Sequence, residues 1–324
     1  MALIEAKLEP KHPAIPTPKP AFVSLKNVLF ACDFSTTSEV ALPYATAICR
    51  HFAATLHLAH VMSDTGMLML SGGVDYVSMG TIYEDAHTEA KERLERISLG
   101  LGEIPHHCHV RHGQVWQNLA EIVRQNEIDL IVVGTHGRTG LGKLLLGSVA
   151  EDILRHAPCP VLTVGPKVAG RAKLPALQAR RRDVAPVDLE LHEIVFATNF
   201  GQDATTAAKT AVLLAEEFQA HLTLLHVIEN YTELGSHPGP IEEGLRRLQE
   251  LVPADAVLQY MPERALEFGS ATECILRIAA EREADMIVLG ARGTLEVGTT
   301  HLPWSTTHHV LANAQCPVLT VRGD

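Results

Sequence analysis

The sequence predicts an α/β protein made of two tandem domains, each an open parallel five-stranded sheet with helices on both faces. Short continuous apolar runs, which are typical of strands covered on both faces, alternate with stretches whose apolar residues recur at helical spacing. Such alternation favours parallel strands joined by right-handed helical crossovers. The second half of the 324 residues repeats the pattern of the first, which indicates a duplicated domain.

The first domain is expected over residues 24–166, after a proline-rich extended tail at residues 1–23. Its five expected strands are Asn27–Cys32, Leu56–Val61, His107–Arg111, Asp129–Val133 and Pro160–Val164. Its helices are expected after Ser35, near Asp85–Ile97, over Val115–Arg124 and from Gly147 onward. A Met- and Gly-rich stretch from Met62 to about Gly80 is expected to be a loop that acts as a lid or a contact surface.

The second domain is expected over residues 189–324, after a basic, solvated linker at residues 167–188. Its first two strands, Ile194–Phe200 and Leu222–Val227, repeat the first half at a displacement of 166 residues. Its last two, Asp285–Gly290 and Cys316–Val321, repeat it at 156 and 157 residues. The displacement shortens by about ten residues because the second half lacks part of the Met- and Gly-rich stretch.

Charge and composition exclude several classes of protein. The net charge of −11 argues against a general nucleic-acid or anionic-membrane surface, which needs clustered Lys and Arg. No apolar run reaches the roughly 18 to 20 residues that span a bilayer, and the first residues lack the order of a signal peptide. The six cysteines form no C-x-x-C pair. We therefore expect a reduced, cytoplasmic protein that contacts neither nucleic acid nor membrane.

One glycine-rich stretch joins a buried strand to a helix. Gly134 is followed after two residues by Gly137, and after nine more by Gly147 and Ser148. Glycine lets a ligand approach the backbone closely, and a helix N-terminus attracts anions, so the pattern predicts a phosphate-binding loop. Ser148 with Glu151 also fits a capping box, which gives Ser148 a structural alternative as a helix cap.

This pattern resembles the ATP-binding signature of the universal stress protein family, together with Asp33-Phe34-Ser35 after the first strand and His60-Val61 at the end of the second. The resemblance covers nearly all of both halves and implies two Rossmann-like domains. It implies that ribose and adenine contact Ala31, Cys32, Asp33 and Val61. It implies that ribose and phosphates contact Val133, Gly134, His136, Gly137, Arg138, Gly147, Ser148 and Val149.

The second half departs from this pattern where phosphate is expected. Asn199 replaces the acidic residue, and aligning the last strands puts Trp304, after Pro303, opposite Gly147. An indole fills space and proline lacks an N–H donor. We therefore predict a weak or empty second site, formed by Asn199, Val227, Gly290, Arg292, Gly293 and Ser305.

Other chemistries are less well supported by the residues. Residues 137–143 match the start of a P-loop, but Leu144 stands where Ser or Thr ligates magnesium. His107 and His109 share a strand face without nearby carboxylates or thiolates, so no metal site is expected. No catalytic triad or pair of catalytic carboxylates stands out. Asp33 and His136 are candidates for slow ATP hydrolysis, so binding is better supported than turnover.

The sequence thus predicts an ATP-binding protein that acts in stress response through nucleotide-dependent regulation or interaction. An interaction scaffold that binds no nucleotide and a slow ATP hydrolase are the alternatives. ATP, with or without Mg²⁺, is the expected cofactor. Because members of this family pair through their last strands, Pro160–Val164 is expected to pair with Pro317–Val321 within the chain. A homodimer and an unknown protein partner remain open.

Overall fold

The computed structural model describes residues 25–63, 76–135, 147–168, 189–229, 239–291 and 303–323. The strands of the first half are β1 (Asn27–Ala31), β2 (Thr55–Met62), β3 (His106–His112), β4 (Leu130–Gly134) and β5 (Val161–Val164). Those of the second half are β6 (Glu193–Thr198), β7 (His221–Ile228), β8 (Glu263–Phe268), β9 (Met286–Ala291) and β10 (Val318–Arg322).

Helices connect these strands in both halves. The first half contains α1 (Thr36–Phe52), α3 (Tyr76–Ser98), α4 (Val115–Gln125) and α5 (Ser148–His156). The second half contains α6 (Ala204–Phe218), α7 (Gly239–Glu250), α8 (Ala271–Glu281) and α9 (Pro303–Asn313). The predicted alternation of strands and helices is confirmed.

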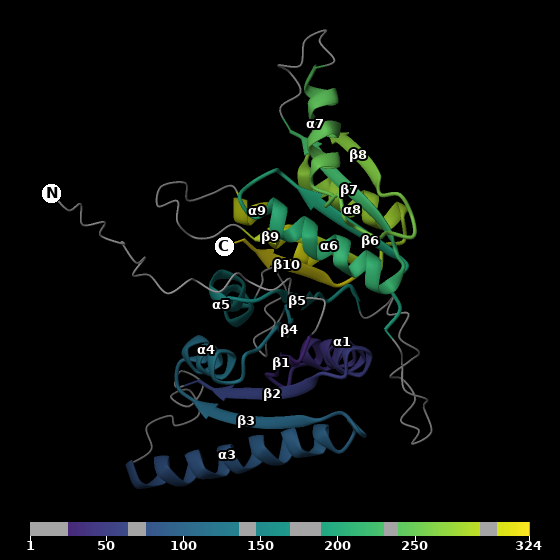
Figure 1. The fold of residues 1–324 in the computed structure, drawn as a ribbon. Coiled ribbons are helices and arrows are strands. Elements are labelled where there is room, and N and C mark those ends of the chain that lie inside the picture. The colour runs from purple at the N-terminus through teal and green to yellow at the C-terminus, as the bar shows by residue number, and fades with distance from the viewer. Residues whose placement is uncertain are drawn as a thin grey trace, which may run out of the picture.

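All ten strands belong to one continuous sheet in the order β3-β2-β1-β4-β5-β10-β9-β6-β7-β8 (Figure 1). Neighbouring strands within each half are parallel. The halves join through β5 and β10, which are antiparallel, with Leu162 opposite Leu319. This is the internal pairing that the sequence predicts. It covers the edge that each five-stranded half would otherwise expose.

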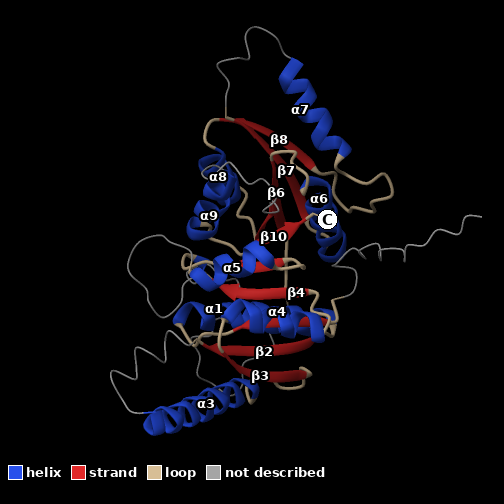
Figure 2. Cartoon of the chain, turned by 90° about the vertical axis from the view of Figure 1, so that its left-hand side faces the viewer, coloured by secondary structure: helices blue, strands red, loops and turns tan. Residues whose placement is uncertain are grey.

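Helices cover both faces of the sheet (Figure 2). Apolar residues of α1, α3, α6 and α7 form one core with one set of strand residues, such as Phe30 and Phe196. Residues of α4, α5, α8 and α9 form a second core with the alternate strand residues, such as Leu29 and Val195. Because each core contains residues of both halves, the two domains are packed as one body on a shared sheet.

The duplication extends to backbone details. Phe34 and Phe200, which stand 166 residues apart, both have positive φ, at 60° and 57°. Two further pairs with positive φ follow the same repeat, Ala53 with Gln219 and Glu127 with Glu283. Non-glycine residues rarely adopt this conformation. The two halves therefore share the same unusual turns, not only the same order of elements.

The bounds of one predicted loop need correction. The loop predicted from Met62 to about Gly80 is wrong at its ends, because Met62 belongs to β2 and α3 begins at Tyr76. Gly80 disfavours a helix by about 1 kcal/mol, but the packing of Ala90 and Leu94 against the sheet stabilises α3 as a whole. Val168, in the region predicted to be linker, is buried in the first core. Residues 1–24, 64–75 and 169–188 lie outside the described residues.

Candidate functional site

A cavity of about 660 Å³ lies at the carboxyl ends of β1, β2 and β4 in the first half. From β1 the chain proceeds outward to β2 and β3, and β4 lies on the other side of β1, so the cavity sits where the strand order reverses. Open α/β sheets bind ligands at this place, and the volume falls within the usual range for small-molecule sites. The cavity is therefore the candidate functional site.

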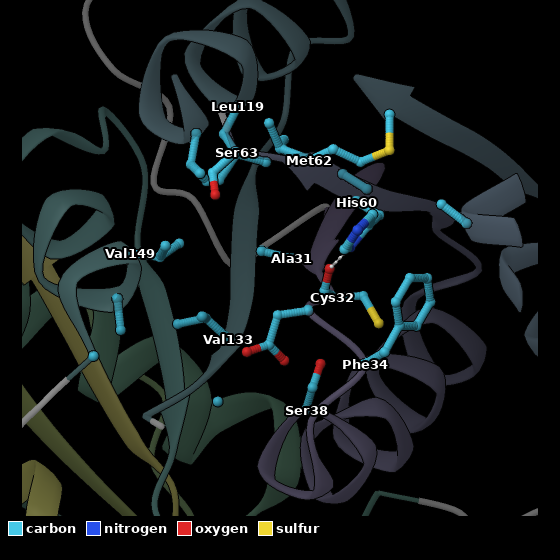
Figure 3. A pocket seen from close by; sticks show the side chains of 18 of the residues that line it. Ala31, Cys32, Phe34, Ser38, His60, Met62, Ser63, Leu119, Val133 and Val149 are labelled. Atoms are coloured by element: carbon cyan, nitrogen blue, oxygen red, sulfur yellow. Dashed lines mark hydrogen bonds between the residues drawn. The ribbon is translucent and has the colours of Figure 1, made fainter. Parts of the chain in front are cut away.

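The structure brings together nine of the residues that the sequence predicts for nucleotide binding. They line this one cavity: Ala31, Cys32, Asp33, Val61, Val133, Gly134, Gly147, Ser148 and Val149. Figure 3 shows several of them around the cavity, including Ala31, Cys32, Val133 and Val149. The other three, His136, Gly137 and Arg138, lie outside the described residues.

The chain turns sharply between β1 and α1. The Asp33 carboxylate Oδ1 accepts a hydrogen bond from the Ser35 backbone N–H at 2.9 Å, which closes a short side-chain turn. Ser35 is the N-cap of α1, and its hydroxyl accepts from the Ser38 N–H at 3.2 Å. Local polar chemistry thus anchors Asp33 at the cavity while the chain passes from strand to helix.

Helix α5 begins at the opposite side of the cavity. The Gly147 N–H donates to the Thr135 carbonyl at 2.7 Å. The two described residues on either side of segment 136–146 therefore lie next to each other. Gly147 is the N-cap and makes no side-chain cap bond. The amides of Ser148, Val149 and Ala150 therefore have no acceptor within the helix and stand beside the cavity, where an anion can accept from them.

The capping-box alternative for Ser148 is wrong. Ser148 is the first helical residue rather than the cap. Glu151 instead binds Arg155 one turn later, with Oε1 and Nη2 2.7 Å apart. Because Gly147 can supply no side-chain oxygen, the helix starts without a capping side chain. The Ser148 hydroxyl is thus left on the exposed side of the first turn.

Cys32 and His60 form the wall between β1 and β2. The His60 Nδ1–H donates to the Cys32 carbonyl at 2.8 Å, a bond that Figure 3 marks with a dashed line. The pKa of the Cys32 thiol is raised, and burial is the largest of several causes. A raised pKa keeps the group as a protonated thiol, which is less reactive than a thiolate.

Several lining residues were not predicted from the sequence. They come from β2, α3 and α4, and include Met62, Glu89, Arg93, Val115 and Leu119. Arg93 and Glu89 form a loose ion pair on α3, 3.8 Å apart. Phe34 and His60 also line the cavity. The sequence offered a signal for these two, because the second half repeats them at Phe200 and His226. Nothing in the sequence places α3 against this cavity.

The counterpart region of the second half differs. Asn199 Oδ1 accepts from the Gly201 N–H at 2.9 Å, the same turn that Asp33 makes. Helix α6 starts at Ala204, two residues later than α1 in the repeat, and α9 starts at Pro303, two residues earlier than α5. Val227 and Gly290 each lie one residue before the end of β7 and β9, whereas Arg292, Gly293 and the side chain of Ser305 are not described.

The late start of α6 places a buried carboxylate over Gly290. Asp203 Oδ1 accepts from the Gly323 N–H at 2.6 Å, and a Cβ added at Gly290 would stand 3.2 Å from the Asp203 Cβ. Gly290 corresponds to Gly134, which lines the cavity of the first half. The side chain of Asp203 therefore occupies space beside the strand end at which the second half would meet a phosphate or ribose.

Two absences concern only the residues that the structure describes. No group of three or more His, Cys, Asp or Glu side chains within them is arranged to hold a metal ion. Within the same ranges, no helix combines the length and the apolar character needed to cross a membrane.

The parallel α/β halves, with a cavity at the switch point and a helix N-terminus beside it, define a doubly wound, Rossmann-like class of fold. The sequence profile of the universal stress protein family matches residues 24–165 and 190–322. The chain therefore belongs to the universal stress protein family and carries two of its domains in tandem.

Individual relatives agree with this assignment. Universal stress protein A homolog 1 of Coxiella burnetii is 34% identical over 140 residues, which are 43% of this chain and 95% of that protein. A universal stress protein of Thermus aquaticus is 40% identical over 129 residues, 37% of this chain and 93% of the relative. A crystal structure of a universal stress protein from Archaeoglobus fulgidus shares the fold over 92% of this chain and 98% of its own, with a TM-score of 0.65 and 20% identity.

Proposed function

We propose that the first domain binds ATP and that the protein acts in stress response through nucleotide-dependent regulation or interaction. The observation that carries this proposal is the cavity at the switch point, which combines a suitable volume with the uncapped N-terminus of α5. The glycine pattern that resembles the family's ATP-binding signature ends at this same helix. Sequence and geometry thus support one ligand at one place.

The chemistry of the lining assigns the parts of the nucleotide to different walls. The first-turn amides of α5 and the Ser148 hydroxyl suit the phosphates, because they donate hydrogen bonds at the positive end of a helix dipole. The half-buried Gly147 leaves room for the phosphate chain. Asp33 suits a ribose hydroxyl, which donates to a carboxylate. The apolar side chains of Val61, Val115 and Leu119 suit the faces of adenine.

We propose one competent site per chain. The Asp203 side chain crowds the space beside Gly290, and Pro303 lacks the N–H that would begin a phosphate cradle on α9. The proposed second-site residues Asn199, Val227, Gly290, Arg292, Gly293 and Ser305 therefore hold nucleotide weakly or not at all. The second domain acts mainly as a structural partner.

Binding without rapid turnover is the proposed activity. The Asp33 carboxylate, the candidate for orienting a water, already accepts the Ser35 N–H. We therefore propose at most slow hydrolysis, and we leave the need for Mg²⁺ to experiment. We place the protein in the cytoplasm, with a protein partner still to be identified and a homodimer as an open possibility.

The experiment uses the purified full-length chain. Denaturation should release adenine nucleotide that chromatography identifies, and added ATP should raise the melting temperature. A ligand at 100 times its Kd stabilises the folded state by about 2.7 kcal/mol. If no nucleotide is released and millimolar ATP leaves the melting temperature unchanged, the scaffold alternative replaces this proposal. Phosphate release measured over hours separates binding from slow hydrolysis.

A further inference from the structure

Three side chains from separate elements pack against one another beside the cavity. The Arg93 guanidinium of α3 lies 4.8 Å from the centre of the Phe34 ring, within cation–π range. The Phe34 ring in turn lies 4.3 Å from the His60 ring of β2. Through His60 this row of side chains reaches the backbone at the end of β1, because the His60 Nδ1–H donates to the Cys32 carbonyl. We call Arg93, Phe34 and His60 the brace.

The second half contains the same arrangement. Arg247 lies 4.1 Å from the Phe200 ring, which lies 4.3 Å from the ring of His226. The His226 Nδ1–H donates to the Thr198 carbonyl at 2.8 Å, the same length as in the first half. The brace is therefore present in both domains, although only the first has the glycine pattern and the α5 start that suit a nucleotide.

The brace holds a strained segment of backbone. Phe34 has φ of 60°, which is unfavourable for a large side chain and persists only where the surroundings enforce it. His60 holds the carbonyl of Cys32, the residue before Asp33. Packing of the Phe34 ring against His60 holds the residue after Asp33. Asp33 thus stands between two held residues, and Cys32, Asp33, Phe34, His60 and Arg93 all line the cavity.

We propose that His60, Phe34 and Arg93 are positioning residues for the nucleotide in the first domain. They hold Asp33 and the end of β1 in the geometry that meets the ligand. In the second domain the equivalent brace serves the fold alone. This inference rests on the proposed function, since it concerns the ligand of the same cavity.

The two copies provide a matched experiment in the full-length chain. The variants are His60→Ala and His226→Ala, with His60→Asn as a rescue that keeps an N–H donor near the position of Nδ1. ATP affinity is measured by isothermal titration calorimetry, and stability by urea unfolding. We expect both alanine variants to lose similar stability. Only His60→Ala should bind ATP at least about tenfold more weakly, and His60→Asn should recover most of that loss.

A second pair covers the case in which His60→Ala does not fold. Arg93→Met and Arg247→Met remove a partly exposed guanidinium from each brace and keep the aliphatic stem. Only Arg93→Met should weaken ATP binding. Unchanged ATP affinity in folded His60→Ala or Arg93→Met, or an equal change in the second-domain variants, overturns the positioning role. A wild-type chain that binds no ATP overturns the proposed function instead.

Discussion

His57 is a buried imidazole on β2 with two other histidines beside it. Its Nδ1 lies 3.1 Å from Nε2 of His109, and its ring centre lies 5.2 Å from that of His107. Only one of the two close nitrogens can carry a proton, so the pair is stable when both rings are neutral. Burial, followed by the nearby His109 and His107, lowers the pKa of His57 to about 4. Burial also lowers the pKa of His109.

These pKa shifts predict that the protein loses stability in mild acid. The unfolded chain has histidine pKa values near 6.5, so between about pH 6.5 and 4 it binds more protons than the folded chain. The contribution of neutral His57 to the free energy of unfolding is therefore fully present above about pH 6.5 and is lost as the pH falls toward 4. A shift of this size corresponds to a loss of about 3 kcal/mol. Urea unfolding at pH 7 and pH 4.5 measures it.

His57→Gln is the control for this pH effect, because glutamine keeps polar atoms but takes up no proton. We expect the variant to lose clearly less stability between the two pH values than the wild type does. Equal losses in both proteins would assign the acid sensitivity to other groups. The neighbouring His107 and His109 remain present in both proteins, so the comparison isolates the buried ring.

Gly147 gives a prediction about the ligand rather than the fold. Its φ of −63° and ψ of 144° suit any residue, so Gly147→Trp introduces no backbone strain. The indole would fill the cavity beside the first turn of α5. We expect the variant to keep its circular dichroism spectrum and to lose ATP binding in calorimetry. Unchanged affinity would mean that the phosphates lie elsewhere.

At the scale of elements, one aspartate in each half ties the start of a central strand to its neighbour. Asp129 Oδ2 accepts from the N–H groups of Lys26 and Asn27 at 2.8 and 2.9 Å. In the second half Asp285 Oδ2 accepts from His192 and Glu193 at 2.7 and 3.1 Å. Each carboxylate thereby satisfies two backbone donors where β1 or β6 begins, and so fixes the alignment with β4 or β9.

Removing one such carboxylate should destabilise its own half. Hydrogen bonds to charged groups contribute about 1.5–3 kcal/mol, so we expect Asp129→Ala to lower the free energy of unfolding by an amount in this range. Asp285→Ala should have a similar effect. Asp129→Asn keeps one acceptor oxygen and should cost less. Urea unfolding checks all three variants, and a neutral effect of Asp129→Ala would show that water replaces the carboxylate at no cost.

At the scale of the whole molecule, the contact between β5 and β10 makes one body of two domains. All four residues of β5 are buried, and Leu162 is 1% exposed opposite Leu319. The Thr320 hydroxyl also donates to the Val161 carbonyl at 3.2 Å. Around this contact, His51 of α1 meets Glu217 of α6 with Nε2 and Oε1 2.9 Å apart. The repeat aligns these two residues, so the domains face each other about an approximate twofold axis.

The buried contact between β5 and β10 leads to a prediction for an isolated first domain. A fragment of residues 24–168 retains the buried Val168 but exposes the β5 edge, which then has unpaired backbone groups and apolar side chains. We expect this fragment to form dimers through β5 in sedimentation experiments. The full-length chain, in which β10 already covers that edge, is the control. A folded fragment that remains monomeric would show that β5 does not self-associate.

Many features of the fold and site were predictable because they depend on local patterns. Continuous apolar runs such as Leu130–Val133 reveal buried strands, and Asp33 and Gly147 stand at strand and helix ends that the sequence marks directly. The comparison of the two halves adds the altered second site. Arg93 was not predictable, since the Met- and Gly-rich stretch hides the start of α3 and separates it from the rest of the pattern.

The sequence by itself determined the two-domain α/β fold, the internal repeat and the strand-end residues of the candidate site. These follow from periodicity and from turn chemistry within a few residues. Only the tertiary structure decided the partners that lie far apart in the chain: Arg93 on Phe34, His109 on His57, and Asp203 over Gly290. The reason is physical, because such contacts depend on which helix covers which strand end, and no local pattern specifies that.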